Sequence, residues 1–257
     1  MTVQVGVRPE GEVFVVTLND VARRNALSLE MRQELCVRLR ELMDEKACRA
    51  IVITGAGGQF CVGGDVNQMQ VRTADESRAR LALVHDLIRL VVAGPKPVVT
   101  AIEGTAAGGG VSIVAGSDYA VAATNARFAS SFLRAGVLPD MGALWTVPHR
   151  IGLTEARRFF TLGRILSGEE AARLGLVDQA VEPGRALATA IGVAAEYSAV
   201  PPQTFAMYKD ALANRAATFE DALAAELDHQ PRLLLTSDQR EAVAAFLEKR
   251  KPRFNGR

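Results

Sequence analysis

One acidic residue, Asp140, lies alone in the segment RAGVLPDMGALW, residues 134–145. No other aspartate or glutamate occurs between Tyr119 and Thr154, and apart from Arg134 the segment is apolar or neutral. Burial among apolar side chains raises the pKa of a carboxyl group and makes it a useful base near neutral pH. The order Pro-Asp-x-Gly also favours a β-turn in which the aspartate bonds its own backbone. Asp140 is therefore a turn residue, a proton-transfer group, or both.

Two glycine-rich segments each follow a predicted buried strand. They are GAGGQFCVGGD, residues 55–65, and GTAAGGGVS, residues 104–112. In the first, Phe60 occupies the third glycine position of the dinucleotide pattern G-x-G-x-x-G, and the second lacks the lysine of a phosphate-binding P-loop. Bare backbone N–H groups in such loops can instead stabilise negative charge on a carbonyl oxygen. For either segment alone, tight turns or close packing are the better explanation.

Other side chains offer weaker candidates for chemistry. Ser112 lacks the G-x-S-x-G setting of a nucleophilic serine, and the three histidines, His85, His149 and His229, show no partner pattern. Cys61 precedes a glycine pair but is better explained as a small buried side chain. No spacing of His, Cys or carboxylate residues suggests metal ligation, so we predict no metal site.

The composition is that of a soluble globular enzyme. The chain has 257 residues and a formal net charge of +1, which provides no overall field to attract nucleic acid or an anionic membrane. Its longest apolar runs are too short to span a bilayer, and its first residues show no basic-then-apolar signal pattern. The odd number of cysteines indicates reduced thiols. We expect a cytoplasmic protein that binds neither nucleic acid nor membrane.

The hydrophobic pattern predicts alternating strands and helices up to about Arg150, which is typical of α/β layers with the chemistry in loops after strands. A helix is expected from Leu29 to about Lys46, with Ser28 as its N-cap. The other predicted elements are a helix at 75–93 and strands at 3–7, 13–18, 49–55, 95–104 and 119–124, the first two forming a hairpin.

Beyond Arg150 the pattern is almost entirely helical, with one strand predicted at 176–181. The sequence VPPQ interrupts the chain near Val200, and we place a soft boundary there between a core of residues 1–200 and a helical region of residues 201–257. The helices of the second region carry more Ala and Leu than a free surface should. We therefore expect them to pack against another subunit.

Four motifs occur in order along the chain: NALS at 25–28, FCVGGD at 60–65, GTAAGGGVSIVAGSDYAVA at 104–122 and FLEKRKPRFNGR at 246–257. This ordered set resembles the crotonase superfamily, the enoyl-CoA hydratase/isomerase family. The resemblance implies an α/β fold, a crotonase-like spiral of ββα units with a C-terminal helical oligomerisation region. It also implies an acyl-CoA thioester as substrate and a homotrimer or a dimer of trimers. No cofactor is implied, because coenzyme A enters as part of the substrate.

The resemblance also assigns roles to particular residues. The backbone N–H groups of Gly64 and Gly109 would hold the thioester oxygen. Phe132 and Trp145 would form part of the acyl pocket wall, although core packing explains them nearly as well. Arg23 and Arg24 would lie in the coenzyme A groove, although a solvated charged turn explains these two residues equally well. The residues implied for substrate and coenzyme A binding beside Phe132 and Trp145 are Arg23, Arg24, Ala26, Val62, Gly63, Gly64, Asp65, Val66 and Gly108.

The choice of reaction depends on carboxyl groups. Hydratases of the family hold a water molecule between two glutamates, and the corresponding positions here look like Ser112 and Phe132, neither of which is a general base. Isomerases of the family often carry an aspartate in a PD-x-G context eight residues after the second position, which is Asp140. We therefore expect an enoyl-CoA double-bond isomerase, similar to those of aromatic-acid and unsaturated fatty-acid breakdown, with Asp140 as its single acid/base. The alternatives are a hydratase with a second group that we do not identify, a thioester hydrolase, and a catalytically silent coenzyme A-binding subunit.

Overall fold

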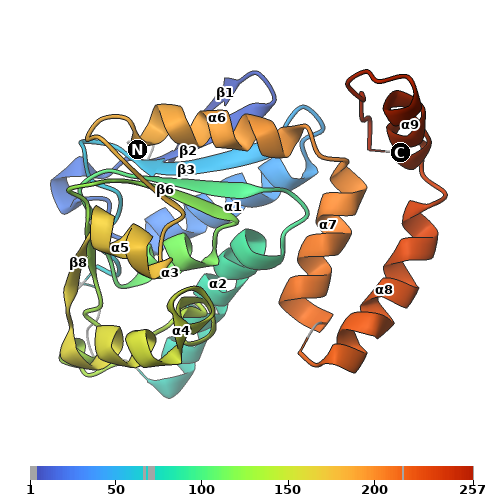
Figure 1. The fold of residues 1–257 in the computed structure, drawn as a ribbon. Coiled ribbons are helices and arrows are strands. Elements are labelled where there is room, and N and C mark those ends of the chain that lie inside the picture. Colours follow the sequence, from blue (N-terminus) through green and yellow to red (C-terminus); the bar gives the residue numbers. More distant parts are fainter. Residues whose placement is uncertain (1–4, 66–67, 69–72, 216, 257) are drawn as a thin grey trace.

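A six-stranded sheet forms the centre of the molecule (Figure 1). The structure is a computed structural model that describes residues 5–65, 68, 73–215 and 217–256. The strand order is β1-β2-β3-β4-β6-β9, with β1 and β2 antiparallel and the following pairs parallel. The strands are β1 (Val5–Glu10), β2 (Val13–Leu18), β3 (Ala50–Gly55), β4 (Val98–Ile102), β6 (Tyr119–Ala123) and β9 (Gln179–Val181).

Helices cover both faces of this sheet, which explains why inner strands such as β3 and β4 are buried and mainly apolar on both faces. In β3, Ile51 and Ile53 pack into the larger hydrophobic core on one face, whereas Ala50 and Val52 pack into a smaller core on the other. The helix α6 (Ala186–Ser198) covers the smaller core (Figure 1). Its buried residues are Ala186, Ala190 and Ala194, spaced by four so that one stripe of small side chains faces the sheet.

The larger core lies beneath α1 (Leu29–Asp44), α2 (Ala74–Ala93) and α3 (Gly109–Gly116). As predicted, Ser28 is the N-cap of α1, and its Oγ accepts a hydrogen bond from the backbone N–H of Met31 at 3.2 Å. The expected hairpin is also present. Its strand pairing runs through Glu10, so the turn is shorter than the RPEGE segment suggests.

A second, three-stranded sheet was not predicted from the sequence. It contains β5 (Thr105–Ala107), β7 (Arg127–Ala129) and β8 (Ile165–Ser167), in that order. Three residues are too few for an alternating pattern to be recognised. This sheet nevertheless matters for the site, because β5 leads directly into the glycines at the start of α3. The helix α4 (Ala143–Leu162) lies between β7 and β8, and α5 (Gly168–Leu174) follows β8.

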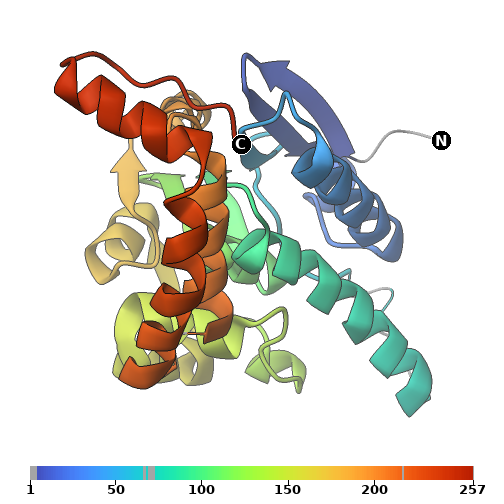
Figure 2. The same cartoon turned by 90° about the vertical axis from the view of Figure 1, so that its right-hand side faces the viewer.

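The last helices stand beside the body of the molecule, as two perpendicular views show (Figures 1 and 2). They are α7 (Pro202–Asp210), which continues into a π-helical turn (Ala211–Arg215), then α8 (Phe219–Leu233) and α9 (Ser237–Leu247). The almost fully buried Lys209 of α7 forms an ion pair with Asp118, just after α3, with 2.6 Å between Nζ and Oδ2. The expected boundary at Val200 falls in the short connection between α6 and α7.

Candidate active site

The first wall of the site is the loop that contains residues 61–65, and the NALS motif holds it in place. The buried side chain of Asn25 donates hydrogen bonds to the carbonyl oxygens of Ala56 and Gln59 at 3.0 and 2.7 Å. The backbone N–H of Leu27 donates to the carbonyl oxygen of Gly63 at 2.7 Å. In a trans peptide the C=O and the following N–H point in opposite directions, and the described residues contain no cis peptide. The N–H of Gly64 therefore points away from Leu27.

The second wall is the glycine segment that opens α3. Gly108 has a φ of 49° and a ψ of −121°, and its N–H donates to the carbonyl oxygen of Ala129 at 3.1 Å. Gly109 is the first residue of α3, and N–H groups in the first turn of a helix have no acceptor within that helix. The donor that this segment can offer to a ligand is thus Gly109 rather than Gly108.

The two glycine walls touch each other. A Cβ atom on Gly63 would lie 2.7 Å from the carbonyl oxygen of Ala107 and 3.2 Å from the backbone nitrogen of Gly109. The contact is reinforced by strand-like hydrogen bonds, from the N–H of Cys61 to Thr105 and from that of Ala107 back to Cys61, both 2.9 Å long. Glycine at position 63 is therefore required by this close approach as well as by its φ of 86°.

Asp140 lies beside the same end of α3. The buried hydroxyl of Ser112 donates a hydrogen bond to the carbonyl oxygen of Asp140 at 3.0 Å. The neighbouring Met141 places its Sδ only 3.0 Å from where a Cβ on Gly109 would be. The predicted base and the predicted oxyanion donor are therefore brought together by α3, although 31 residues separate them in the sequence.

The environment of the Asp140 carboxyl group agrees with a role as a base. The residue is half-buried, and burial raises the pKa of its carboxyl group above the ordinary value. The guanidinium of Arg32, the backbone N–H of Asp140 itself and the side chain of His85 oppose this rise without cancelling it. The backbone N–H that acts on the carboxyl group is that of Asp140 itself, and the chain turns here, with the N–H of Ala143 donating to the carbonyl oxygen of Asp140 at 3.1 Å. The turn and proton-transfer interpretations of Asp140 are thus compatible.

The two expected glutamate positions are both within reach of this site. Ser112 is fully buried, and its hydroxyl is occupied by Asp140. Phe132 is also buried, and its Cε1 lies 3.9 Å from the position of a Cβ on Gly108. Phe132 therefore contacts the glycine segment. Cys61 lies fully buried behind the loop, and burial raises the pKa of its thiol to about 12, so the thiolate is not accessible at neutral pH.

The expected coenzyme A groove contains both exposed and buried residues. Arg23 is partly exposed and forms ion pairs with Asp20 at 2.7 Å and with the buried Asp65 at 3.3 Å. Arg24 is exposed, with a φ of 51°, and its carbonyl oxygen accepts a hydrogen bond from the N–H of Val62 at 3.3 Å. Ala26 is buried beneath this turn. Val66 was also predicted here, but it lies outside the described residues.

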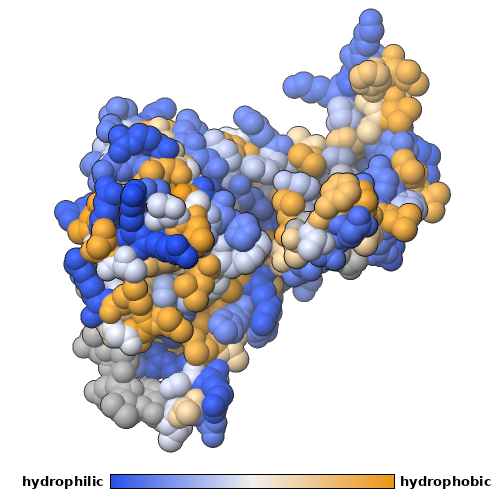
Figure 3. Space-filling view, turned by 60° about the horizontal axis from the view of Figure 1, so that its bottom comes forward, coloured by the Kyte–Doolittle hydropathy of each residue, from blue (hydrophilic) through white to orange (hydrophobic). Residues whose placement is uncertain are grey.

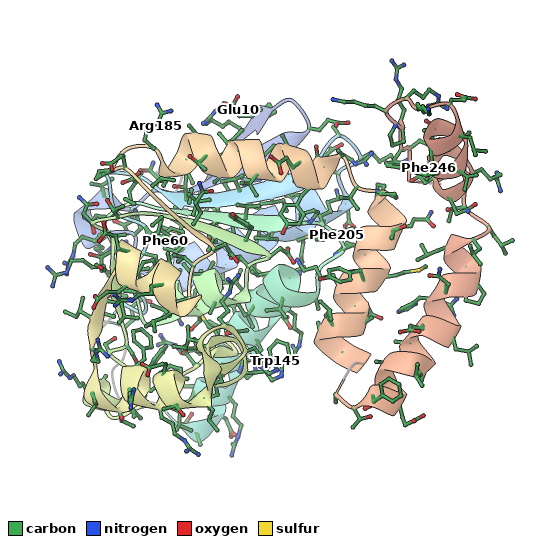
Figure 4. The ribbon with its side chains drawn as sticks, viewed as in Figure 1. Glu10, Phe60, Trp145, Arg185, Phe205 and Phe246 are labelled. Carbon is green, nitrogen blue, oxygen red and sulfur yellow. The ribbon has the colours of Figure 1, made fainter. Side chains whose placement is uncertain are left out.

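Trp145 lies away from the two glycine walls. Its ring packs against His149, with 4.1 Å between ring centroids. Together with Phe205 of α7 it lines a pocket of about 300 Å³ that also includes Asp118, beyond the last turn of α3 (Figure 4). Gly109 begins α3 at the opposite end. The structure thus groups Trp145 with α7 and not with the two glycine walls.

Comparison with known proteins identifies the family. The chain matches the family model described as Enoyl-CoA hydratase/isomerase over residues 8–257. The chain belongs to this family. It is 32% identical over 253 residues to 1,2-epoxyphenylacetyl-CoA isomerase of Escherichia coli (strain K12), which covers 96% of this chain and 97% of that protein. It is 34% identical over 244 residues to a probable enoyl-CoA hydratase of Rhodobacter capsulatus, covering 95% and 94% of the two chains.

Solved structures of enoyl-CoA hydratases have the same fold. The enoyl-CoA hydratase of Bacillus anthracis aligns with a TM-score of 0.92 at 28% identity, covering 99% of this chain and all of that one. The enoyl-CoA hydratase of Polaromonas sp. JS666 aligns with a TM-score of 0.90 at 34% identity, covering 97% and 99%. The predicted crotonase fold with a C-terminal helical region is therefore confirmed.

Sequence reasoning missed two features of this enoyl-CoA hydratase/isomerase family site. One is the hydrogen bond between Ser112 and Asp140, which no local pattern indicates. The other is Arg32, a buried cation in the first turns of α1 that acts electrostatically on Asp140. The only hint in the sequence was that Arg32 directly follows the apolar Met31 in the predicted helix. Among the described residues no group of three or more His, Cys, Asp or Glu side chains could hold a metal ion. None of the described helices is long and apolar enough to cross a membrane.

Proposed function

We propose that this chain is an enoyl-CoA isomerase in which Asp140 moves a proton between C2 and C4 of the acyl group. The observation that carries the proposal is the position of Asp140, half-buried and hydrogen-bonded through its backbone to α3, the helix that starts at Gly109. The positions where we expect the two glutamates of the family's hydratases hold Ser112 and Phe132. One carboxyl group suffices for isomerisation, because the base that takes the first proton becomes the acid that returns it.

The reaction would begin with the thioester oxygen accepting hydrogen bonds from the N–H groups of Gly64 and Gly109. Asp140 would remove a proton from C2 of a 3-enoyl-CoA, leaving a dienolate whose negative charge lies largely on the thioester oxygen. Each backbone donor aimed at that oxygen contributes about 3 kcal/mol to the transition state, and the N-terminal end of α3 adds to this field. Asp140 would then return the proton to C4, which gives the 2-enoyl-CoA. Positioned proton transfer of this kind contributes roughly 10²–10⁴-fold.

Coenzyme A would lie along the loop that faces the turn of Arg23 and Arg24. Arg23 is partly exposed, but its guanidinium pairs with both Asp20 and Asp65, so a phosphate would have to compete with these carboxylates for it. Ala26 and Val62 would support the pantetheine arm beside Gly63 and Gly64. Phe132 would form part of the acyl pocket. We propose no further cofactor.

We also infer that the molecule forms a homotrimer or a dimer of trimers through its C-terminal helices. Figure 3 shows apolar side chains over the projecting part of the chain formed by these helices. In α8, Leu223 and Leu227 lie four residues apart on one face, and in α9 Phe246 is 84% exposed. Such a surface is costly in an isolated chain and typical of a subunit contact. The apolar residues exposed on and between α8 and α9 are Phe219, Leu223, Leu227, Leu234, Leu235, Val243, Phe246 and Leu247.

Hydration is the second candidate function. It is favoured by the names of several relatives, which include the short-chain-enoyl-CoA hydratase of Clostridium acetobutylicum, 31% identical over 245 residues and covering 94% of each chain. A hydratase mechanism would use Asp140 with a second group to hold and activate water. The positions of Ser112 and Phe132 argue against it, because neither side chain can serve as a general base at neutral pH.

The test is a product analysis with purified wild-type protein. A 3-enoyl-CoA and a 2-enoyl-CoA are supplied separately at equal concentration, and the products are separated chromatographically. We expect rapid conversion of the 3-enoyl to the 2-enoyl thioester, with negligible 3-hydroxyacyl-CoA. Substantial 3-hydroxyacyl-CoA would contradict the isomerase and favour the hydratase. Tight binding without turnover of either substrate would favour a silent subunit.

A further inference from the structure

Arg32 is a buried cation for which the fold supplies no complete set of acceptors. It is the fourth residue of α1 and is only 9% exposed. Its Nε is fully buried without a hydrogen-bond partner, and no ion pair involves its guanidinium within the described residues. Buried guanidinium groups in folded proteins are normally paired, because an uncompensated charge in a low-dielectric environment is costly. Within the part of the chain that the structure describes, the Nε of Arg32 therefore lacks an acceptor.

The charged groups around Arg32 include Asp65 of the first wall and Asp140. Burial, followed by the positive charge of Arg80 on α2, lowers the pKa of Arg32, whereas the carboxylates of Asp140 and Asp65 oppose this. Asp65 is already paired with Arg23. The second guanidinium, that of Arg80, is half-buried and donates to the backbone carbonyl of Gln68. The guanidinium of Arg80 thus acts electrostatically on that of Arg32, and its own hydrogen bond is to a neutral carbonyl that leaves its charge unpaired among the described residues.

The start of α1 connects Arg32 to the reacting atoms. Leu27, just before the helix, places its Cδ1 3.0 Å from the position of a Cβ on Gly109, the proposed oxyanion donor. Ser28 and Arg32 are separated by one helical turn, an advance of about 5.4 Å. An acyl chain whose thioester oxygen is bound at Gly109 would therefore bring Arg32 within reach after a few carbon atoms.

We propose that Arg32, with Arg80 beside it, determines substrate specificity by binding a carboxylate at the far end of a short acyl chain. The preferred substrate class would be a coenzyme A thioester of an unsaturated dicarboxylic acid. The planar guanidinium matches a carboxylate with paired hydrogen bonds, and a neighbouring second cation favours an anionic ligand over a neutral one. Asp140 and the two glycine donors keep the roles given above. This inference rests on the proposed acyl-CoA site and adds its substrate class.

The test measures binding rather than turnover, so it does not depend on which reaction the site performs. Glutaryl-CoA and pentanoyl-CoA have five-carbon acyl groups without a reactive double bond and differ in the terminal carboxylate. Their dissociation constants are measured by calorimetry for the wild type, Arg32→Met, Arg32→Lys and Arg80→Met. The control is Arg38→Met, which removes an exposed arginine of the same helix that pairs with Glu41.

The wild type and the Arg38→Met variant should bind glutaryl-CoA at least about tenfold more tightly than pentanoyl-CoA, as expected for a charge-assisted hydrogen bond. Arg32→Met should abolish this preference and leave pentanoyl-CoA affinity nearly unchanged. Arg32→Lys and Arg80→Met should reduce the preference only in part. Because Arg32→Met removes an unpaired buried charge, it should melt no lower than the wild type, which verifies that it folds.

Equal binding of the two thioesters by the wild type would overturn the inference. So would an Arg32→Met variant that keeps the preference or weakens both thioesters equally. If Arg32→Met instead lowers only turnover, with both affinities intact, Arg32 serves Asp140 and not the substrate, and the specificity role is wrong. Failure of the wild type to bind either thioester would refute the acyl-CoA site itself.

Discussion

At the scale of single residues, the raised pKa of Asp140 links activity to stability. Burial is the largest cause of the rise, so ionisation of this carboxyl group is less favourable in the folded chain than in the unfolded one. The folded state then binds the proton more tightly, and its stability falls as the pH rises from the unfolded pKa through the folded one. Above that pH range the carboxylate of Asp140 is ionised and destabilises the folded protein. A catalytic base must be ionised to accept a proton, whereas a residue that only shapes a turn need not be.

Replacing Asp140 by Asn should therefore stabilise the protein at neutral and alkaline pH. An effect on the order of 1 kcal/mol would raise Tm by roughly 2–4 °C in a chain of this size. The gain should shrink at pH 4, where the wild-type carboxyl group is increasingly protonated. Thermal unfolding of both proteins between pH 4 and pH 9 measures this difference. A gain that grows at low pH would show that the pKa is lowered, not raised.

Ser112 is the residue that fixes the backbone of Asp140. Ser112→Ala removes the donor to the Asp140 carbonyl, which should cost about 1 kcal/mol of stability and reduce kcat by roughly tenfold or more with little change in KM. Ser117→Ala is the matched control, because it removes a buried hydroxyl bonded to Val114 at the other end of α3. Steady-state kinetics of the two variants give kcat and KM separately for each. Equal losses of kcat in both variants would contradict the positioning role of Ser112.

At the scale of elements, the site depends on the contact between the loop at 61–65 and the start of α3. Gly63→Ala would place a Cβ 2.7 Å from the Ala107 carbonyl and would add a strained φ of 86°. Gly58→Ala is the control, since its φ of 68° is strained as well but no atom lies within 4 Å of the new Cβ. We expect both variants to lose about 1 kcal/mol from backbone strain, and only Gly63→Ala to lose further stability and turnover.

Unfolding free energies and kcat/KM for the two glycine variants test this expectation. If Gly63→Ala is as active as Gly58→Ala, the two walls do not need to touch for catalysis. The oxyanion assignment would then lose its structural basis.

How far the site could be predicted differs between its parts. Asp140 and the glycines could be selected as candidates because a lone carboxyl group and repeated glycines are visible in the local sequence. The Ser112 bond to Asp140 was not, because it joins residues 28 positions apart and depends on how α3 packs. Trp145 was expected in the wall of the acyl pocket, with core packing as the alternative, and the structure places it at the start of α4 in a pocket shared with α7.

The same distinction holds for the fold. Strands such as β3, with an unbroken β-branched run, and helices with a marked cap, such as α1, were predicted from their local pattern. The short β5, β7 and β8 were missed because their pairing, not their composition, makes them strands. Arg32 was missed because a charged residue is ordinarily assigned to the surface.

At the scale of the whole molecule, the C-terminal helices are tied to the body at one end and expose apolar side chains at the other. Arg49 donates to the carbonyl oxygens of Ser198 and Phe254, at 3.1 and 3.2 Å, which ties the last residues to the end of α6. This arrangement fixes the direction in which α8 and α9 extend. It is the form expected of a subunit that completes its surface with other copies of itself.

We therefore expect the double variant Leu227→Glu, Phe246→Glu to dissociate the assembly, because both side chains are largely exposed in the single chain. Val37→Glu, at a half-exposed apolar position of α1, is the control and should leave the assembly intact. Light scattering after size exclusion gives the mass of each. A wild type that runs as a monomer, or a double variant of unchanged mass, would refute assembly through these helices.

The central claim is that a single carboxyl group, Asp140, carries the proton from C2 to C4. The most direct measurement supplies 3-enoyl-CoA deuterated at C2, in ordinary water, to the wild type and to Asp140→Asn, and follows the products by NMR. Wild type should form 2-enoyl-CoA with part of the deuterium at C4, and Asp140→Asn should be slower by roughly 10²–10⁴-fold while still binding the thioester. If Asp140→Asn transfers deuterium to C4 as fast as the wild type, Asp140 is not the base.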